Sequence, residues 1–190
     1  MNQSQVMELL RETGVLHQGH FRLTSGKHSD TYLQCALVLQ YPDKAGLLCS
    51  QLAANFKDET IDAVIGPAIG AVVMAQETAR ALGVRAIFTE RENGRMVLRR
   101  GFAIKPGERF LAVEDVVTTG GSVQEVLEVV KDLGGVPVGV GAIVDRSGGQ
   151  ALFPVPLHAL VKVEAKIYQP EECPLCQQGL PLVKPGSRQV

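Results

Sequence analysis

The stretch that decides the fold runs from Phe110 to Ser122 and reads Phe-Leu-Ala-Val-Glu-Asp-Val-Val-Thr-Thr-Gly-Gly-Ser. Its first four residues are apolar, which is typical of a strand buried on both faces. Two acids follow at once, then a hydroxyl- and glycine-rich turn, and from Ser122 the spacing of apolar residues becomes helical. The pattern predicts a parallel strand whose carboxyl end meets a helix, which is where open α/β sheets bind their ligands.

The turn before Ser122 has the composition of an anion-binding loop. Gly120 and Gly121 allow a close backbone approach that a Cβ would block, so N–H groups at the helix N-terminus can face a phosphate. Glu114 and Asp115 would repel a phosphate, but they suit ribose hydroxyls or a hydrated magnesium ion. The segment therefore predicts a holder for a sugar phosphate; the alternative is a plain strand-to-helix turn with a serine N-cap. The predicted binding residues are Glu114, Asp115, Val116, Val117, Thr118, Thr119, Gly120, Gly121 and Ser122.

Strands and helices alternate on both sides of this segment, which predicts an α/β fold with a mainly parallel twisted sheet flanked by helices. Asn93-Gly94 predicts a two-residue hairpin turn between residues 88–91 and 96–99. Residues 15–40 look irregular, with short strand-like pieces at 21–23 and 31–38. Helices are expected over 3–13, 43–56, 71–82 and 122–133, and strands over 61–65, 85–89, 110–113, 136–144 and 157–163.

Composition excludes several classes of function. The 190 residues include 19 Lys and Arg against 20 Asp and Glu, for a net charge of −1, so bulk electrostatics predict no nucleic-acid partner. No apolar run approaches the roughly 18 residues of a membrane span, and the polar start, Met1–Gln5, does not resemble a signal peptide. We therefore expect a single-domain cytoplasmic protein with no membrane partner.

Cys173-Pro-Leu-Cys176 forms the one C-x-x-C motif of the chain. It offers two of the four ligands of a structural zinc ion, so a zinc site would need distant residues or another chain. His17, His20, His28 and His158 show no metal-ligand spacing and are interpreted as surface or packing residues, except that His28 lies in a family-like loop described below. The pattern favours a reduced surface turn over a zinc site.

Residues 114–122 resemble the signature for 5-phosphoribosyl-1-pyrophosphate (PRPP) in the type I phosphoribosyltransferases. The resemblance implies a sheet with a small N-terminal hood over its strand ends and a C-terminal tail. It also implies a magnesium-dependent transferase in which Mg²⁺ is held through PRPP, near Glu114 and Asp115. The single domain would then comprise a hood and base-site region over about 1–40, a PRPP-binding core over about 41–165 and a tail over about 166–190.

The N-terminal region is similar to that of the orotate phosphoribosyltransferases, and the matching order extends over nearly the whole chain. The matches there are Val15-Leu16, Gly19, Phe21, Leu23, Ser25–Ser29 and Tyr32-Leu33. The resemblance also covers a pyrophosphate-binding loop at Gly66–Ala71, with Pro67, Ala68, Ile69 and Gly70 as PRPP contacts. Val144-Asp145-Arg146 matches the strand end where the family sets an arginine against the orotate carboxylate, which a guanidinium fork fits. The Cys173–Cys176 motif and the tail Lys184–Arg188 resemble the C-terminal segment that a subset of the family has.

The resemblance implies transfer of the phosphoribosyl group to orotate, giving orotidine 5′-monophosphate in pyrimidine (UMP) biosynthesis. It further implies a homodimer. The residues it assigns to orotate are Thr118, Arg146, Lys27, Tyr32 and Leu33.

Segment 90–96 departs from the family pattern. Many orotate enzymes have a mobile loop with an Arg-Lys start, a further Lys and a His that closes over the partner's site, whereas this segment has no Lys or His. Arg91 and Arg95 are its candidate catalytic cations, beside Glu114 and Asp115. The family also often has Tyr-Lys at Ile69-Gly70 and Lys at Thr24.

Two other functions stay open at this point. The first is a purine phosphoribosyltransferase, and the second is a PRPP-sensing regulator, which predicts a basic face or a helix-turn-helix extension. The sequence leaves open whether the 91–96 hairpin acts across a dimer, what the two cysteines do, and whether a second enzyme is a stable partner.

Overall fold

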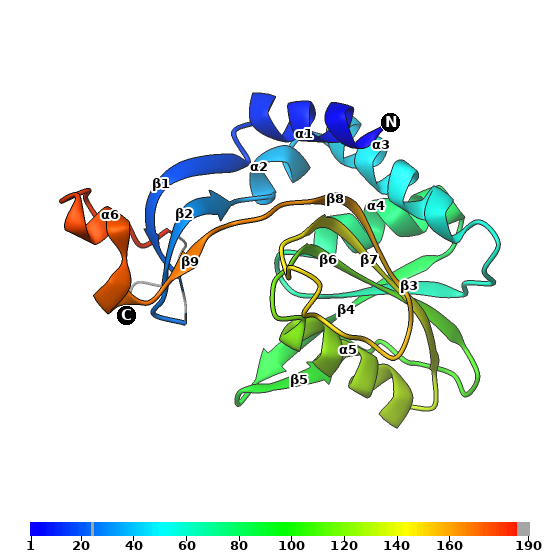
Figure 1. Cartoon of the computed structure of the whole chain (residues 1–190). Coiled ribbons are helices and arrows are strands. Elements are labelled where there is room, and N and C mark those ends of the chain that lie inside the picture. The colour runs from blue at the N-terminus through cyan, green and yellow to red at the C-terminus, as the bar shows by residue number, and fades with distance from the viewer. Residues whose placement is uncertain (24, 186–190) are drawn as a thin grey trace.

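The computed structural model describes residues 1–23 and 25–185, which fold into two sheets (Figure 1). The larger sheet has six strands in the order β5-β4-β3-β6-β7-β8, and the smaller has three in the order β1-β2-β9. Thr24 and residues 186–190, including Arg188 of the family-like tail, lie outside the described residues. No helix among the described residues is long and apolar enough to cross a membrane.

The large sheet is parallel except at one edge. In the order of the sheet, the neighbouring strands β4, β3, β6, β7 and β8 pair in parallel. The edge strand β5 is antiparallel to β4. The turn between β4 and β5 is the predicted Asn93-Gly94 hairpin, with positive φ angles of 51° and 80° that match a primed turn. The strands are β3 (Ala63–Pro67), β4 (Arg85–Glu92), β5 (Arg95–Leu98), β6 (Arg109–Val117), β7 (Val136–Asp145) and β8 (Leu157–Lys162).

Helices cover both faces of this sheet (Figure 1). Residues of α1 (Gln3–Glu12), α3 (Pro42–Ala53) and α4 (Val72–Leu82) pack into one core, and those of α5 (Gly121–Asp132) pack into the other. The four predicted helices are confirmed, with ends that differ by at most three residues. Short helices also occur at α2 (Ala36–Leu39), α6 (Pro174–Gln177), η1 (Ala54–Phe56) and η2 (Pro170–Glu172).

Strand β6 lies at the centre of the packing. Leu111 and Val113 belong to the core with α1, α3 and α4, whereas Phe110 and Ala112 belong to the core with α5. Because successive side chains of a strand point to opposite faces, the apolar run contributes to both cores. The predicted strand is confirmed and is longer than expected, since pairing with β7 continues through Val117.

The N-terminal region is more regular than predicted. Strand β1 (Leu16–Arg22) pairs with β2 (His28–Leu33) in a hairpin, and Val38 lies in α2 rather than in a strand. Four of the seven residues of β1 are exposed, and its sequence lacks the alternation of apolar and polar residues that would predict a strand. The strand therefore depends on its cross-strand hydrogen bonds to β2. The chain returns late to this hairpin, with β9 (Ile167–Tyr168) pairing with His28 and Ser29.

Candidate functional site

The turn between β6 and α5 forms a small pocket with the features of an anion site. The N-cap of α5 is Gly120, at φ 80°, and no side chain caps the first turn of the helix. A Cβ on Gly120 would lie 2.8 Å from the ring of Phe153, so glycine is required here. The alternative of a serine N-cap is therefore wrong, and the first N–H groups of α5 stay available to an anion. The pocket, of about 50 Å³, is lined by Glu114, Val116, Val117, Thr118, Thr119, Gly120, Gly121, Ser122 and Val123.

Glu114 and Asp115 form a half-buried carboxyl pair near the end of β6. Asp115 Oδ1 accepts the backbone N–H of Val116 at 2.8 Å. Burial, followed by the neighbouring charge of Asp115, raises the pKa of Glu114 to about 8, and burial also raises the pKa of Asp115. Within the described residues neither carboxyl forms an ion pair with Lys or Arg. The pair therefore suits hydroxyl donors or a cation supplied from outside the protein.

The chemistry of this pair fits Mg²⁺. Magnesium prefers oxygen ligands and is commonly held by one or two carboxylates together with substrate phosphates. Two adjacent carboxyls beside an anion pocket offer that combination. Glu114 and Asp115 are the residues that would lie nearest such an ion.

The loop after β3 passes beside the carboxyl pair. An added Cβ on Gly70 would lie 3.5 Å from both carboxylate oxygens of Asp115. The peptide between Ala68 and Ile69 is cis, the Ala68 N–H donates to the Thr89 carbonyl at 2.7 Å, and the Ile69 side chain is 88% exposed. Because β3 and β6 are parallel neighbours, their carboxyl ends meet at one sheet edge and bring both predicted PRPP segments together.

Arg146 joins this group from the end of β7. Its backbone N–H donates to the Val117 carbonyl at 2.8 Å, which fastens it to the end of β6. Its side chain is half-buried, burial lowers its pKa, and its buried Nε has no hydrogen-bond partner in the described part of the chain. A buried guanidinium nitrogen without a partner is costly unless a ligand satisfies it.

Tyr32, on strand β2 of the β1–β2 hairpin, approaches Asp115 and Arg146 from the small sheet. Burial raises the pKa of Tyr32, the charge of Asp115 raises it further, and the charge of Arg146 opposes both, so the phenol lies near the two groups. Leu33, the next residue on β2, points to the opposite face and is buried in the core. The structure thus brings Tyr32, but not Leu33, to Asp115 and Arg146.

Comparisons with known proteins assign the chain to a family. The phosphoribosyl transferase domain family matches residues 40–152. The chain is 56% identical to the orotate phosphoribosyltransferase of Desulforamulus reducens and 57% identical to that of Caldanaerobacter subterraneus, in each case over 190 residues and 100% of both chains. This chain belongs to the orotate phosphoribosyltransferase family. Its fold is also that of the orotate phosphoribosyltransferase of Aeropyrum pernix, with a TM-score of 0.68 at 25% identity over 83% of this chain and 93% of that one.

The family's remaining predicted residues lie apart from this group. Lys27 is exposed, one residue before β2, and about 17 Å from Tyr32 along the strand. Arg91 donates to the Gly94 carbonyl at 2.8 Å and to Glu125 of α5 at 2.9 Å, and Arg95 is exposed on β5. Arg91 thus fastens the β4–β5 hairpin to α5. The catalytic roles of Arg91 and Arg95 stay predictions.

A larger hollow, of about 270 Å³, lies between α1 and β8, away from these residues. None of the residues predicted to bind PRPP or orotate contributes to its wall, and it lacks the anion-binding turn of the smaller pocket. It is lined by Gln3, Ser4, Met7, Arg11, Val161 and Lys162.

The two cysteines of the C-x-x-C motif differ from the prediction of a surface turn. Cys173 is fully buried, although Cys176 is exposed. His20, interpreted as a surface or packing residue, and His28, placed in the family-like loop, are both buried and face these sulfurs. Only the pairing of β1, β2 and β9 brings the four together, so no spacing in the sequence could have indicated the cluster.

The buried carboxyl pair predicts a pH-dependent stability. The pKa of Glu114 rises from an ordinary 4.5 to about 8 on folding, so the folded state binds more protons between these values. Stability from this group is therefore fully present below about pH 4.5 and is lost as the pH rises through 8. Without ligands, Glu114→Gln should gain stability over the parent from pH 5 to 9, on the order of 1–3 kcal/mol, as measured by urea unfolding.

The matched control is Glu128→Gln, an exposed acid on α5. Its difference from the parent should stay constant over the same range. A Glu114→Gln difference that did not change with pH would contradict the raised pKa.

Proposed function

We propose that this chain transfers the 5-phosphoribosyl group of PRPP to orotate, releasing pyrophosphate and orotidine 5′-monophosphate in pyrimidine (UMP) biosynthesis. The observation that supports it best is the convergence of an anion-binding turn, a carboxyl pair and a half-buried Arg146 at one sheet edge. The full-length relatives that share 55–57% of the sequence are named orotate phosphoribosyltransferases, and this supports orotate as the base.

In this reaction N1 of orotate displaces pyrophosphate at C1 of the ribose. Positive charge develops on the ribose ring while negative charge gathers on the leaving diphosphate, so positioning and electrostatics supply most of the catalysis. Residues 118–122 would hold the phosphate of the sugar, and this remote binding energy helps to fix the reacting centre. No side chain needs to act as a nucleophile.

The other groups have complementary parts in the proposal. Glu114 and Asp115 would hold the ribose hydroxyls, the backbone of Gly66–Ala71 would face the diphosphate, and the Arg146 fork would bind the orotate carboxylate. When bound, Mg²⁺ would supply positive charge to the leaving diphosphate. Lys27 and Thr118 remain proposed orotate contacts, and Arg91 and Arg95 remain proposed catalytic cations. A homodimer and a cytoplasmic location complete the proposal.

A base panel tests the reaction directly. The pure protein is incubated with PRPP and Mg²⁺ and with orotate, uracil, adenine, hypoxanthine, guanine or xanthine in turn, and nucleotide product is measured by chromatography. Turnover of orotate alone, lost without Mg²⁺, is expected. Turnover of a purine instead would overturn the base assignment, and PRPP binding without any turnover would favour a regulator.

Arg146→Ala tests the carboxylate contact. Losing a charged hydrogen-bond pair should raise the KM for orotate roughly ten- to a hundredfold while changing the KM for PRPP far less. Arg146→Lys keeps the positive charge but lacks the two-pronged guanidinium, so its KM for orotate should lie between those of the parent and of Arg146→Ala. Arg11→Ala, an exposed arginine of α1, is the control. An equal rise in both KM values would remove Arg146 from the base site.

Asp115→Asn tests the acidic pair. We expect weaker PRPP binding by roughly 1.5–3 kcal/mol, the value of a hydrogen bond to a charged group. Isothermal titration with PRPP and Mg²⁺ measures this loss directly, and Asp132→Asn at the end of α5 serves as the control. Unchanged binding in Asp115→Asn would exclude this residue from the PRPP site.

A further inference from the structure

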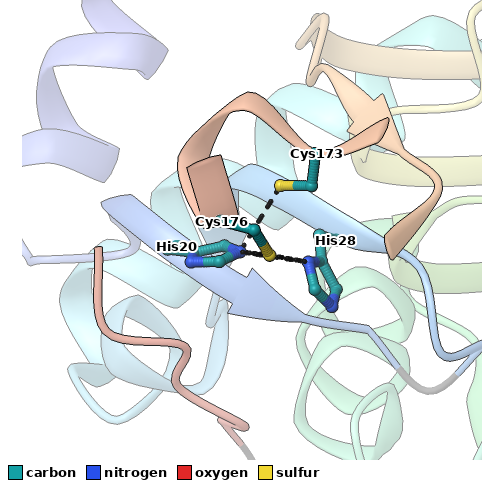
Figure 2. Close-up of side chains that lie close together, drawn as sticks. All are labelled: His20, His28, Cys173 and Cys176. Carbon is teal, nitrogen blue, oxygen red and sulfur yellow. Dashed lines mark hydrogen bonds between the residues drawn. The ribbon is translucent and has the colours of Figure 1, made fainter. Parts of the chain in front are cut away.

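Two histidines and two cysteines from opposite ends of the chain meet at one point (Figure 2). His20 comes from β1 and His28 from β2, whereas Cys173 immediately precedes α6 and Cys176 lies within it. His20 Nε2, His28 Nδ1 and the two sulfurs all lie within 4.8 Å of one another. Figure 2 shows both imidazole rings turned toward the sulfurs.

The spacing of these atoms matches a tetrahedral metal site. Zinc bonds of about 2.0–2.1 Å to nitrogen and about 2.3 Å to sulfur imply edges of about 3.3 Å between two nitrogens and about 3.6 Å between nitrogen and sulfur. The two nitrogens are 3.0 Å apart. The nitrogen–sulfur distances are 3.5 Å and 3.6 Å from His20, and 3.3 Å from His28 to Cys176. One ion at the centre would reach all four atoms with small adjustments.

The surroundings of His20 orient it as a ligand. Its Nδ1 lies 2.9 Å from the Leu180 carbonyl, which can only accept, so we assign the ring proton to Nδ1. The lone pair of Nε2 then points at the cluster. A metal-bound histidine usually donates its other N–H to a carbonyl or carboxylate in this way.

The cluster occupies the place where a small sheet would need a core. His20 and His28 are 3% and 5% exposed and Cys173 is fully buried, yet none of them belongs to either apolar core of the described chain. No residue after Val163 belongs to, or packs against, those cores either, as far as the structure describes the chain. The segment 167–183 meets the hairpin through β9, a bridge from Val183 to Phe21 and this cluster. Small, weakly packed units commonly need a metal or disulfide staple.

We propose that His20, His28, Cys173 and Cys176 bind one structural Zn²⁺ that fastens the C-terminal segment to the β1–β2 hairpin. Two thiolates and two imidazoles in a tetrahedral arrangement favour zinc over the hard cations Mg²⁺ and Ca²⁺. All four positions belong to protein side chains, and this closed set is typical of a structural rather than a catalytic ion. The site is separate from the carboxyl pair at the carboxyl end of β6.

The first test measures zinc in the full-length protein, produced with zinc in the medium and purified without a metal-affinity tag, under reducing conditions. Elemental analysis should find about one zinc ion per chain. Cys176→Ser is the main variant because its side chain is exposed and its loss leaves the apolar cores intact. In competition with a chromophoric chelator, its affinity for Zn²⁺ should fall at least about a hundredfold. His17→Ala, which removes an exposed histidine from the strand that contains His20, should bind Zn²⁺ as tightly as the parent.

Two further measurements keep the proposal falsifiable if a variant folds poorly. Co²⁺ added to the zinc-depleted parent should give the intense visible bands of a tetrahedral ion with thiolate charge transfer. Removing zinc with a chelator should lower the melting temperature of the parent and of His17→Ala, but not that of Cys176→Ser. A parent without zinc and without the tetrahedral Co²⁺ spectrum, or a Cys176→Ser variant with undiminished zinc affinity, would overturn the proposal.

Discussion

The constraint on which the rest of the structure depends is the burial of β6 on both faces. A strand covered by helices on each side has no room for polar side chains along its length, so they gather where the covering ends. In this chain that place is occupied by Glu114 and Asp115, followed by an uncapped helix N-terminus. The pair is held together although burial and mutual repulsion raise the pKa of Glu114 to about 8. An arrangement that lowers stability without a ligand is typical of a site built for one.

The neighbouring strands complete the site because parallel strands end at the same edge. The loop after β3 sets Gly70 against Asp115, and the end of β7 holds Arg146 to Val117 by a backbone hydrogen bond. Tyr32 alone comes from the small sheet, and its pKa responds to both Asp115 and Arg146. The proposed orotate side of the site therefore depends on how the β1–β2 hairpin is held, whereas the proposed phosphate side depends on the large sheet.

The small sheet is stabilised differently from the large one. The large sheet has two apolar cores, whereas β1 is mostly exposed and the late segment that joins the hairpin contributes to neither core. In place of apolar packing, the contact between hairpin and tail contains two imidazoles and two sulfurs. A zinc ion there would bind the first and last parts of the chain together, on the same strand that continues to Tyr32.

Local periodicity and turn chemistry were enough to predict the α/β class, the four main helices, the Asn93-Gly94 hairpin and the glycine-rich turn that leads into α5. Resemblance along the chain added the family and singled out Arg146. Only the tertiary structure showed the course of β1 and β2, the burial of Leu33, the pairing of Arg91 with Glu125, and the meeting of His20 and His28 with Cys173 and Cys176. The pairing of Arg91 with Glu125 and the cluster of His20, His28 and the two cysteines depend on contacts between residues far apart in the chain, 34 positions in the first case and up to 156 in the second. No local pattern records such contacts, since they exist only once the strands have paired.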